Sequence, residues 1–154
     1  MIRSGLLLAS VAVFALASFG ASAQERVFRY ATTGDILGLD PHLHNHGPSN
    51  AVKGTLYGAL VHRKYDLTLD PDLAESWEMV DDVTWEFKLR EGVTFHGGQE
   101  FTADDVIYSF RRITQDGAEM RNYVASVETI EKIDDYNIRI VTKGPDPILL
   151  QNLS

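Results

Sequence analysis

Three histidines at alternate positions are the side chains of this sequence whose spacing most suggests chemistry. His42, His44 and His46 fall within five consecutive residues, and neutral imidazoles are common ligands of zinc, nickel and copper. In an extended segment, alternate residues share a face but are about 6.6 Å apart per pair, too far for one ion unless the loop curls. Asp40 is the only acidic residue nearby. We therefore predict a plain loop without a metal, and keep a metal site as the alternative.

Two other groups could be taken for catalytic residues. His96 is followed by two glycines, with no nucleophile or oriented carboxylate beside it, so a structural hydrogen bond is the better interpretation. Asp104 and Asp105 are adjacent, and adjacent helix positions point in different directions, so helix capping explains both. We predict no catalytic residue, no cofactor and no enzymatic activity.

The first 23 residues have the pattern of a secretory signal peptide. Arg3 supplies a positive start, residues 5–19 are apolar or small, and Ala21-Ser-Ala23 is a cleavage pattern. The apolar run is short of the about 20 residues that a membrane span needs. We predict cleavage after Ala23 and a periplasmic location, with residues 24–154 as the mature part.

Composition limits the partners of that mature part. It has no cysteine, so its stability must come from a packed core. Removal of residues 1–23 leaves 13 basic and 22 acidic residues, a formal charge of −9. Nucleic acids and anionic membranes require clustered positive charge, so we expect neither as a partner.

Hydrophobic periodicity predicts mixed α and β structure. Turns are expected at residues 39–42 and 70–72 because proline fixes its own φ and disfavours helix before it. The expected strands are 26–33, 61–65, 75–80, 83–90, 124–133 and 136–142, the last two joined as a hairpin at Asp134-Asp135; the expected helices are 48–60 and one that starts after Thr102.

The segment Trp85–Phe110 has the clearest local pattern. Val83, Trp85, Phe87 and Leu89 alternate with polar residues, which is typical of a strand with one buried face. Glycines then turn the chain, and Thr102 with Asp105 three residues later has the spacing of a capping box. This segment is predicted to be scaffold.

The C-terminal residues suggest that the chain is part of something longer. Pro147 suits the first turn of a helix, and Ile148, Leu149, Leu150 and Leu153 begin an apolar helix of about two turns. We expect these leucines to be exposed, without a partner, and the chain to be an N-terminal fragment.

Four sequence blocks occur in order along the chain: Leu39-Asp-Pro-His42, Leu56-Tyr-Gly-Ala-Leu-Val61, Pro71-Asp-Leu-Ala-Glu-Ser-Trp77 and Trp85–Phe110. Together they resemble the extracellular solute-binding proteins of family 5, the oligopeptide, dipeptide and nickel-binding components of ABC transporters. Two residues depart from the usual pattern: Gly58 replaces an acidic residue, and Gly97 replaces the aspartate of Phe-His-Asp-Gly.

The resemblance implies an α/β, periplasmic-binding-protein-like fold of type II, two-lobed in the full family. This chain would supply only the N-terminal lobe region, with a mixed sheet and flanking helices. The implied function is to bind peptides or a related small solute, as a monomer, and deliver it to the ABC permease in the inner membrane. A nickel or metal-chelate receptor and a non-functional truncated remnant are the alternatives.

The resemblance also indicates where ligand could be contacted. In the family, the loop after the first strand and the loop after the Leu-Asp-Pro turn border the cleft. Here these are Thr33, Gly34 and Asp35, and the segment 44–50 with His44, His46, Ser49 and Asn50 as candidate ligand-binding residues. Loops on a rigid scaffold often carry binding residues; the alternative is that they are only exposed turns.

Overall fold

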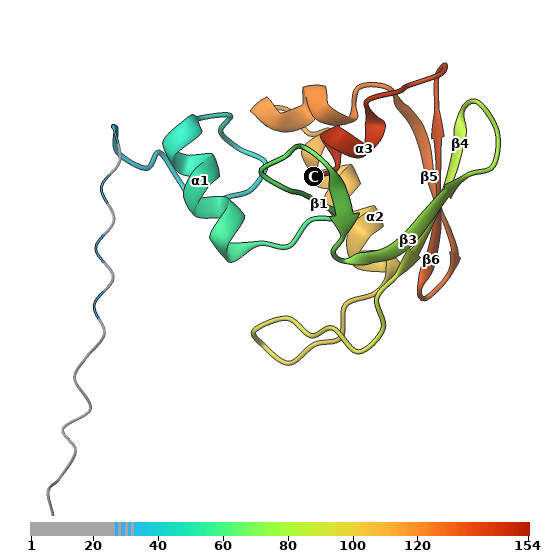
Figure 1. Ribbon diagram of the computed structural model, residues 1–154, viewed down its shortest axis with the longest axis horizontal. Helices are drawn as coiled ribbons and strands as arrows, with labels where there is room; N and C mark the ends of the chain where they lie inside the picture. The colour runs from blue at the N-terminus through green and yellow to red at the C-terminus, as the bar shows by residue number, and fades with distance from the viewer. Residues whose placement is uncertain (1–26, 28, 30, 32) are drawn as a thin grey trace, which may run out of the picture. The chain divides into compact units, whose positions relative to one another are not determined.

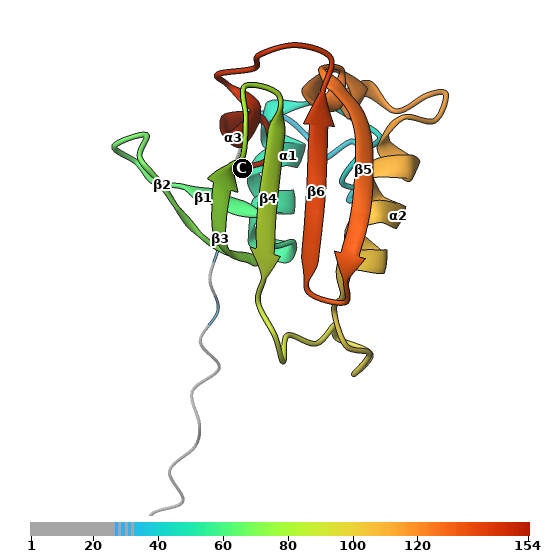
Figure 2. The same cartoon turned by 90° about the vertical axis from the view of Figure 1, so that its right-hand side faces the viewer.

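The main element of the computed structural model is a four-stranded sheet in the order β3-β4-β6-β5 (Figure 2). All of its strand pairs are antiparallel, so it is not the mixed sheet that was expected. Residues 27, 29, 31 and 33–154 are described. The signal peptide predicted over residues 1–23 lies outside the described residues, as does most of the strand predicted over 26–33. The strands are β3 (Ala74–Met79), β4 (Thr84–Leu89), β5 (Val127–Asp134) and β6 (Asn137–Thr142).

The alternation predicted for β4 is present in the second half of the strand, whereas Thr84, Trp85 and Glu86 are all partly buried. Phe87 is opposite Trp77 of β3 and Ile138 of β6. Phe87, Leu89 and Ile138 are buried, whereas Lys88 is exposed. The predicted hairpin is also confirmed, because β5 and β6 pair directly across the turn after Asp134.

Helix α2 (Ala103–Ile113) packs behind this sheet, against β5 (Figures 1 and 2). Ala103, Val106 and Ile107 form its buried face. Its predicted capping box is present: the Thr102 backbone amide donates to the Asp105 carboxylate at 2.9 Å. The sequence pattern and the observed start of the helix therefore agree.

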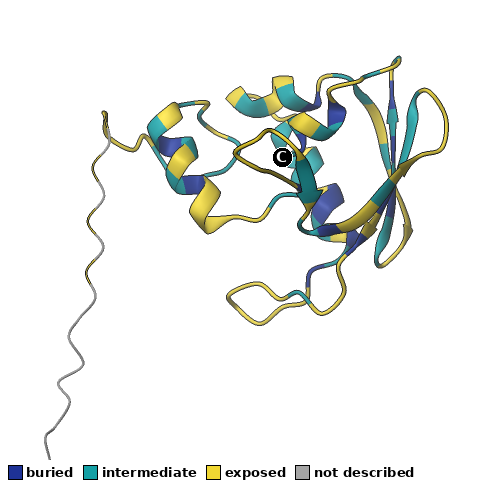
Figure 3. Cartoon of the chain, viewed as in Figure 1, coloured by how far each residue is buried: buried dark blue, intermediate teal, exposed yellow. Residues whose placement is uncertain are grey.

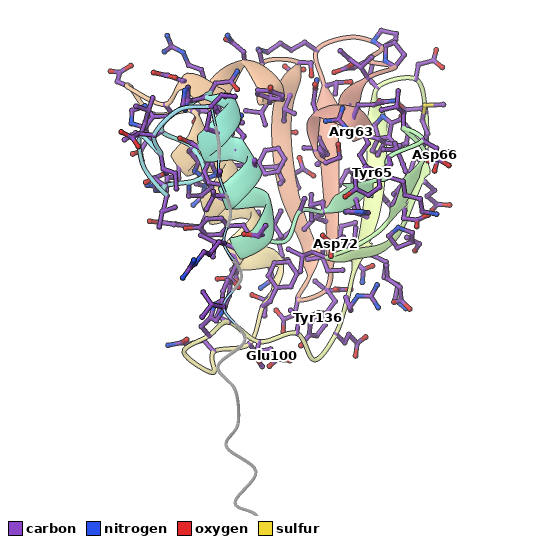
Figure 4. All side chains as sticks on the ribbon, turned by 60° about the vertical axis from the view of Figure 1, so that its left-hand side comes forward. Arg63, Tyr65, Asp66, Asp72, Glu100 and Tyr136 are labelled. Atoms are coloured by element: carbon purple, nitrogen blue, oxygen red, sulfur yellow. The ribbon has the colours of Figure 1, made fainter. Side chains whose placement is uncertain are left out.

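A separate hairpin corrects the turn predicted at residues 70–72. It consists of β1 (Val61–Arg63) and β2 (Leu69–Pro71), with Val61 opposite Pro71. Proline is tolerated on an edge strand, so pairing prevailed over the local turn preference. Figure 4 shows Tyr65 and Asp66 near the end of this hairpin, where the Asp66 carboxylate accepts the Thr68 amide.

Three other predicted boundaries move. The helix expected over 48–60 is α1 (Gly47–Leu56), which ends because Tyr57 has extended backbone angles. The strand expected over 61–65 stops at Arg63. The strand expected from residue 124 begins at Val127, because Glu119–Val124 forms a 3-10 helix, η1.

The last helix, α3 (Leu149–Asn152), overturns the expectation of exposed C-terminal leucines. Leu149 and Leu153 are buried in the same core cluster as Val61, and the Val61 amide donates to the Leu153 carbonyl. Figure 3, coloured by burial, shows part of α3 as buried. Ile148 is exposed. Two leucines four residues apart share a helix face, and here that face packs against the core cluster that includes Val61. Within the described residues, no helix has the length and apolar character to cross a bilayer.

Candidate functional site

The two segments predicted to contact ligand lie side by side. A Cβ atom placed on Gly34 would be 3.8 Å from Pro48 Cγ and 4.0 Å from His46 Cε1. The Leu37 amide donates to Ser49 Oγ at 3.0 Å, which joins the chain two residues after the first segment to the start of α1. The fold therefore brings together two loops that the sequence could only name separately.

The predicted contact residues differ in exposure. Thr33, Gly34 and Asp35 are exposed, and His44 and His46 are half-buried. Ser49 is 0% exposed, and its hydroxyl also lies 3.2 Å from His46 Nδ1. A solute could reach the first five directly, whereas Ser49 supports the loop from inside.

Residues 36–46 form a loop between the Thr33–Asp35 segment and α1, and Asn50 of α1 makes hydrogen bonds to the end of this loop. Asn50 is half-buried, and its side-chain amide donates to Asn45 Oδ1 at 3.0 Å. The Asn50 backbone amide donates to the His46 carbonyl at 2.8 Å. These bonds join the loop to the first turn of α1.

The three histidines have three different sets of partners. His42 contacts Ser109 and Arg112 of α2, His44 Nδ1 lies 3.6 Å from Glu119 Oε1, and His46 contacts Ser49. In the described part of the chain, no group of three His, Cys, Asp or Glu side chains is arranged to hold a metal ion. The imidazoles act separately.

Arg112 fixes the start of the loop to α2. Its guanidinium makes a two-pronged ion pair with Asp40, and it donates to His42 Nδ1 at 3.0 Å. Because Nδ1 accepts, the neutral ring carries its hydrogen on Nε2, which then donates to Ser109 Oγ. Burial, and then the Arg112 charge, lower the pKa of His42. Arg112 therefore favours the neutral form of this imidazole.

The Asp40–Arg112 pair predicts an acid-sensitive contribution to stability. The hydrogen bond from Arg112 holds the pKa of Asp40 well below its usual value of 3.8. Below about pH 4 the unfolded chain therefore binds a proton that the folded chain does not, so this contribution is complete above about pH 5 and decreases as the pH falls below 4. We expect Asp40→Asn to lower the free energy of unfolding near pH 6, and to have less effect near pH 2.5.

Urea denaturation of both proteins across this pH range measures the effect. Asp82→Asn is the control, because Asp82 is an exposed turn residue without an ion-pair partner among the described residues. A difference between wild type and Asp40→Asn that stays constant from pH 6 to 2.5 would contradict the assignment.

Glu119, at the start of η1, holds the other end of the loop. Its carboxylate accepts the Asn45 amide at 2.8 Å, and this bond, with His44 nearby, lowers the pKa of Glu119. Its own amide donates to the Leu43 carbonyl, and the Met120 amide to the His42 carbonyl, both at 3.3 Å. Glu119 was not among the predicted site residues; the nearest signal in the sequence was Gly117, two residues earlier, which adopts φ +88°.

A hollow of about 380 Å³ adjoins this contact. It is lined by Gly117, Ala118, Glu119, Arg121 and Asn122. Glu119 connects the hollow to the loop, and Arg121 is exposed, with no ion pair in the described part of the chain. Half-buried imidazoles on the loop, with a carboxylate and a guanidinium on the adjoining η1, suit non-covalent binding of a small polar solute.

Comparison with known proteins gives consistent matches. The model for "Bacterial extracellular solute-binding proteins, family 5 Middle" matches residues 68–154. Heme-binding protein A of Haemophilus influenzae is 35% identical over 86% of this chain, and Di/tripeptide-binding protein 2 of Pseudomonas aeruginosa is 32% identical over 99%. This chain spans only 28% and 32% of those two proteins.

A solved structure shows the same fold. The binding protein MoaA of A. tumefaciens R10, determined with mannopinic acid, superposes with a TM-score of 0.72 at 33% identity. The match covers 78% of this chain and 26% of MoaA. The mixed α/β arrangement is thus that of part of a periplasmic binding protein, as predicted.

Proposed function

Because this chain belongs to the bacterial extracellular solute-binding proteins of family 5, we propose that it is part of the substrate-binding component of an ABC importer. It binds a peptide or a related small solute and delivers it to the permease in the inner membrane. The observation that carries this proposal is the family match over residues 68–154, more than half of the chain. The di/tripeptide-binding relative supports a peptide as the first solute to test.

Location and mode of action follow from the same proposal. Residues 1–23 act as a signal peptide cleaved after Ala23, and the protein works as a monomer in the periplasm. It binds without chemical conversion, in keeping with a family of non-enzymatic binding proteins. The remaining solute contacts come from a second lobe, since closure of two lobes around a ligand requires contacts from both.

The solute contacts Thr33–Asp35 and the His44–Asn50 loop, beside the hollow at Glu119 and Arg121. This placement is supported by the close approach of Gly34 to His46 and by the anchoring of the loop to α2 and η1. A loop already held in place loses less entropy when it binds. Ser49, being buried, supports the loop and makes no direct contact.

One relative favours a second candidate. Heme-binding protein A is 35% identical to this chain, so a metal chelate such as heme or nickel–histidine is the alternative solute. A half-buried imidazole such as His44 could ligate the metal of such a chelate.

Titration calorimetry of the intact protein with alanyl-alanine, nickel–histidine and hemin separates these candidates. We expect alanyl-alanine to bind, and His44→Ala to raise its Kd at least about tenfold, or about 1.4 kcal/mol. His62→Ala is the control, since His62 is an exposed histidine on the β1–β2 hairpin. Binding of only a chelate would favour the alternative. No binding of any solute, with activity in a peptidase or esterase assay, would refute both.

A further inference from the structure

Lys53 of α1 is a buried cation that forms no ion pair with any of the residues that the structure describes. It is 6% exposed. By contrast, the ion-paired Lys64 and Lys88 are about half exposed. Burying an ammonium group is unfavourable unless its N–H groups are hydrogen-bonded, so its actual partners are informative.

Those partners are two backbone carbonyls of the loop that precedes α1, one of them in the candidate ligand segment 44–50. The Lys53 ammonium donates to the His44 carbonyl at 2.7 Å and lies 3.4 Å from the Pro41 carbonyl. A single charged group therefore spans the loop from residue 41 to residue 44. The segment between these two residues carries His42, whose carbonyl accepts the Met120 amide.

Lys53 and Glu119 hold this loop together. Glu119 binds the Asn45 amide, one residue beyond the carbonyl that Lys53 binds. The positive charge of Lys53 also contributes to the lowered pKa values of both His42 and Glu119. The ammonium thus lies close enough to influence both the conformation and the charge of the loop.

We propose that Lys53 is a positioning residue for ligand binding: its buried ammonium holds the Pro41–His44 backbone so that His44 is presented to the solute. Its link to affinity rests on the proposed function. Since Lys53 is buried, the solute does not contact it, and its effect on affinity is indirect. Without the ammonium, the loop samples other conformations, and binding must select the competent one.

Because the chain contains no cysteine, a cysteine introduced at position 53 is its only thiol and can be alkylated selectively. Substitution by cysteine removes the ammonium, and alkylation can restore it. Lys53→Cys, alkylated in the unfolded state with 2-bromoethylamine and refolded, regains an ammonium at nearly the length of lysine. Alkylation with iodoacetamide instead leaves a neutral side chain. The control is Lys143→Cys treated in the same two ways, because Lys143 donates to the Ala125 carbonyl at the same 2.7 Å but in an exposed position.

Hydrogen exchange and calorimetry on the intact protein provide the two measurements. With the neutral side chain at position 53, we expect exchange of the Asn45 and Met120 amides to accelerate about tenfold. We expect the Kd for alanyl-alanine to rise about tenfold. The pKa of His42, followed by NMR, should rise, because a nearby positive charge and some burial are lost. The aminoethyl side chain should restore all three, and neither form at position 143 should change them.

The outcomes separate this inference from the proposed function. If the wild-type protein does not bind alanyl-alanine, peptide binding fails, and amide exchange still decides the role of Lys53 in the loop. Unchanged exchange at Asn45 with the neutral side chain, or no recovery with the aminoethyl one, would overturn the positioning role. So would altered exchange without a change in Kd in a protein that binds alanyl-alanine. Circular dichroism of each variant identifies any that fail to fold.

Discussion

Replacing Phe87 with alanine is expected to lower the free energy of unfolding by about 3–5 kcal/mol. Phe87 is 1% exposed and lies on β4, a central strand, between Trp77 and Ile138 of the two neighbouring strands. Truncation would leave a cavity in the main core cluster, which a sheet paired on both sides cannot readily collapse to fill. Urea denaturation followed by tryptophan fluorescence measures the change, because both tryptophans, Trp77 and Trp85, lie in this sheet.

Phe95→Ala is the matched control. Phe95 is 47% exposed, and its ring packs edge-on against Phe101 at a centroid distance of 6.2 Å. Losing this contact should cost about 1 kcal/mol. Equal effects at positions 87 and 95 would mean that β4 does not form the centre of the core.

The second large effect is expected at Leu149. We expect Leu149→Ala to lower the free energy of unfolding by about 2–5 kcal/mol, because Leu149 is 0% exposed and belongs to the same core cluster as Val61 and Leu89. The same urea titration measures it. This result would show that the last helix of the chain is part of the core.

Ile148 provides an adjacent control of similar size. It is 56% exposed, so Ile148→Ala should change the free energy of unfolding by about 0.5 kcal/mol or less. If the two substitutions had equal effects, α3 would not be packed as described. A small effect at both positions would restore the expectation that these residues lack a partner.

Local sequence patterns predicted the sheet and α2 well. Alternation identified the buried row Phe87–Leu89, and the spacing of Thr102 and Asp105 identified the capping box. The hairpin at Asp134 was also predicted correctly. In each case the residues that determine the structure lie within a few positions of one another, so their period or spacing is visible in the sequence.

Predictions failed where pairing partners are distant or where several structures suit the same residues. Residues 70–72 have turn chemistry, yet Leu69–Pro71 pairs as a strand because β1 is available to it. The apolar residue Val124 suited a strand but ends a 3-10 helix. Leu149 was expected to be exposed because nothing in the sequence shows that Val61, 88 positions earlier, lies beside it.

The candidate site shows the same division. The resemblance of short blocks named Thr33–Asp35 and residues 44–50, but not the groups that hold them. Arg112 reaches Asp40 across 72 residues, and Glu119 reaches Asn45 across 74. The residues next to Lys53 in the sequence do not indicate that its ammonium is buried against loop carbonyls.

The sequence by itself determined the family, the main sheet, α2 and the two segments where ligand contact is expected. These depend on periodicity, capping and short motifs, which act over a few residues. Only the tertiary structure decided that the C-terminal leucines are buried, that the histidines have separate partners, and that Lys53, Arg112 and Glu119 hold the loop. The reason is physical: burial and hydrogen bonding depend on which surfaces meet in three dimensions, and here the residues that meet are often more than 60 positions apart.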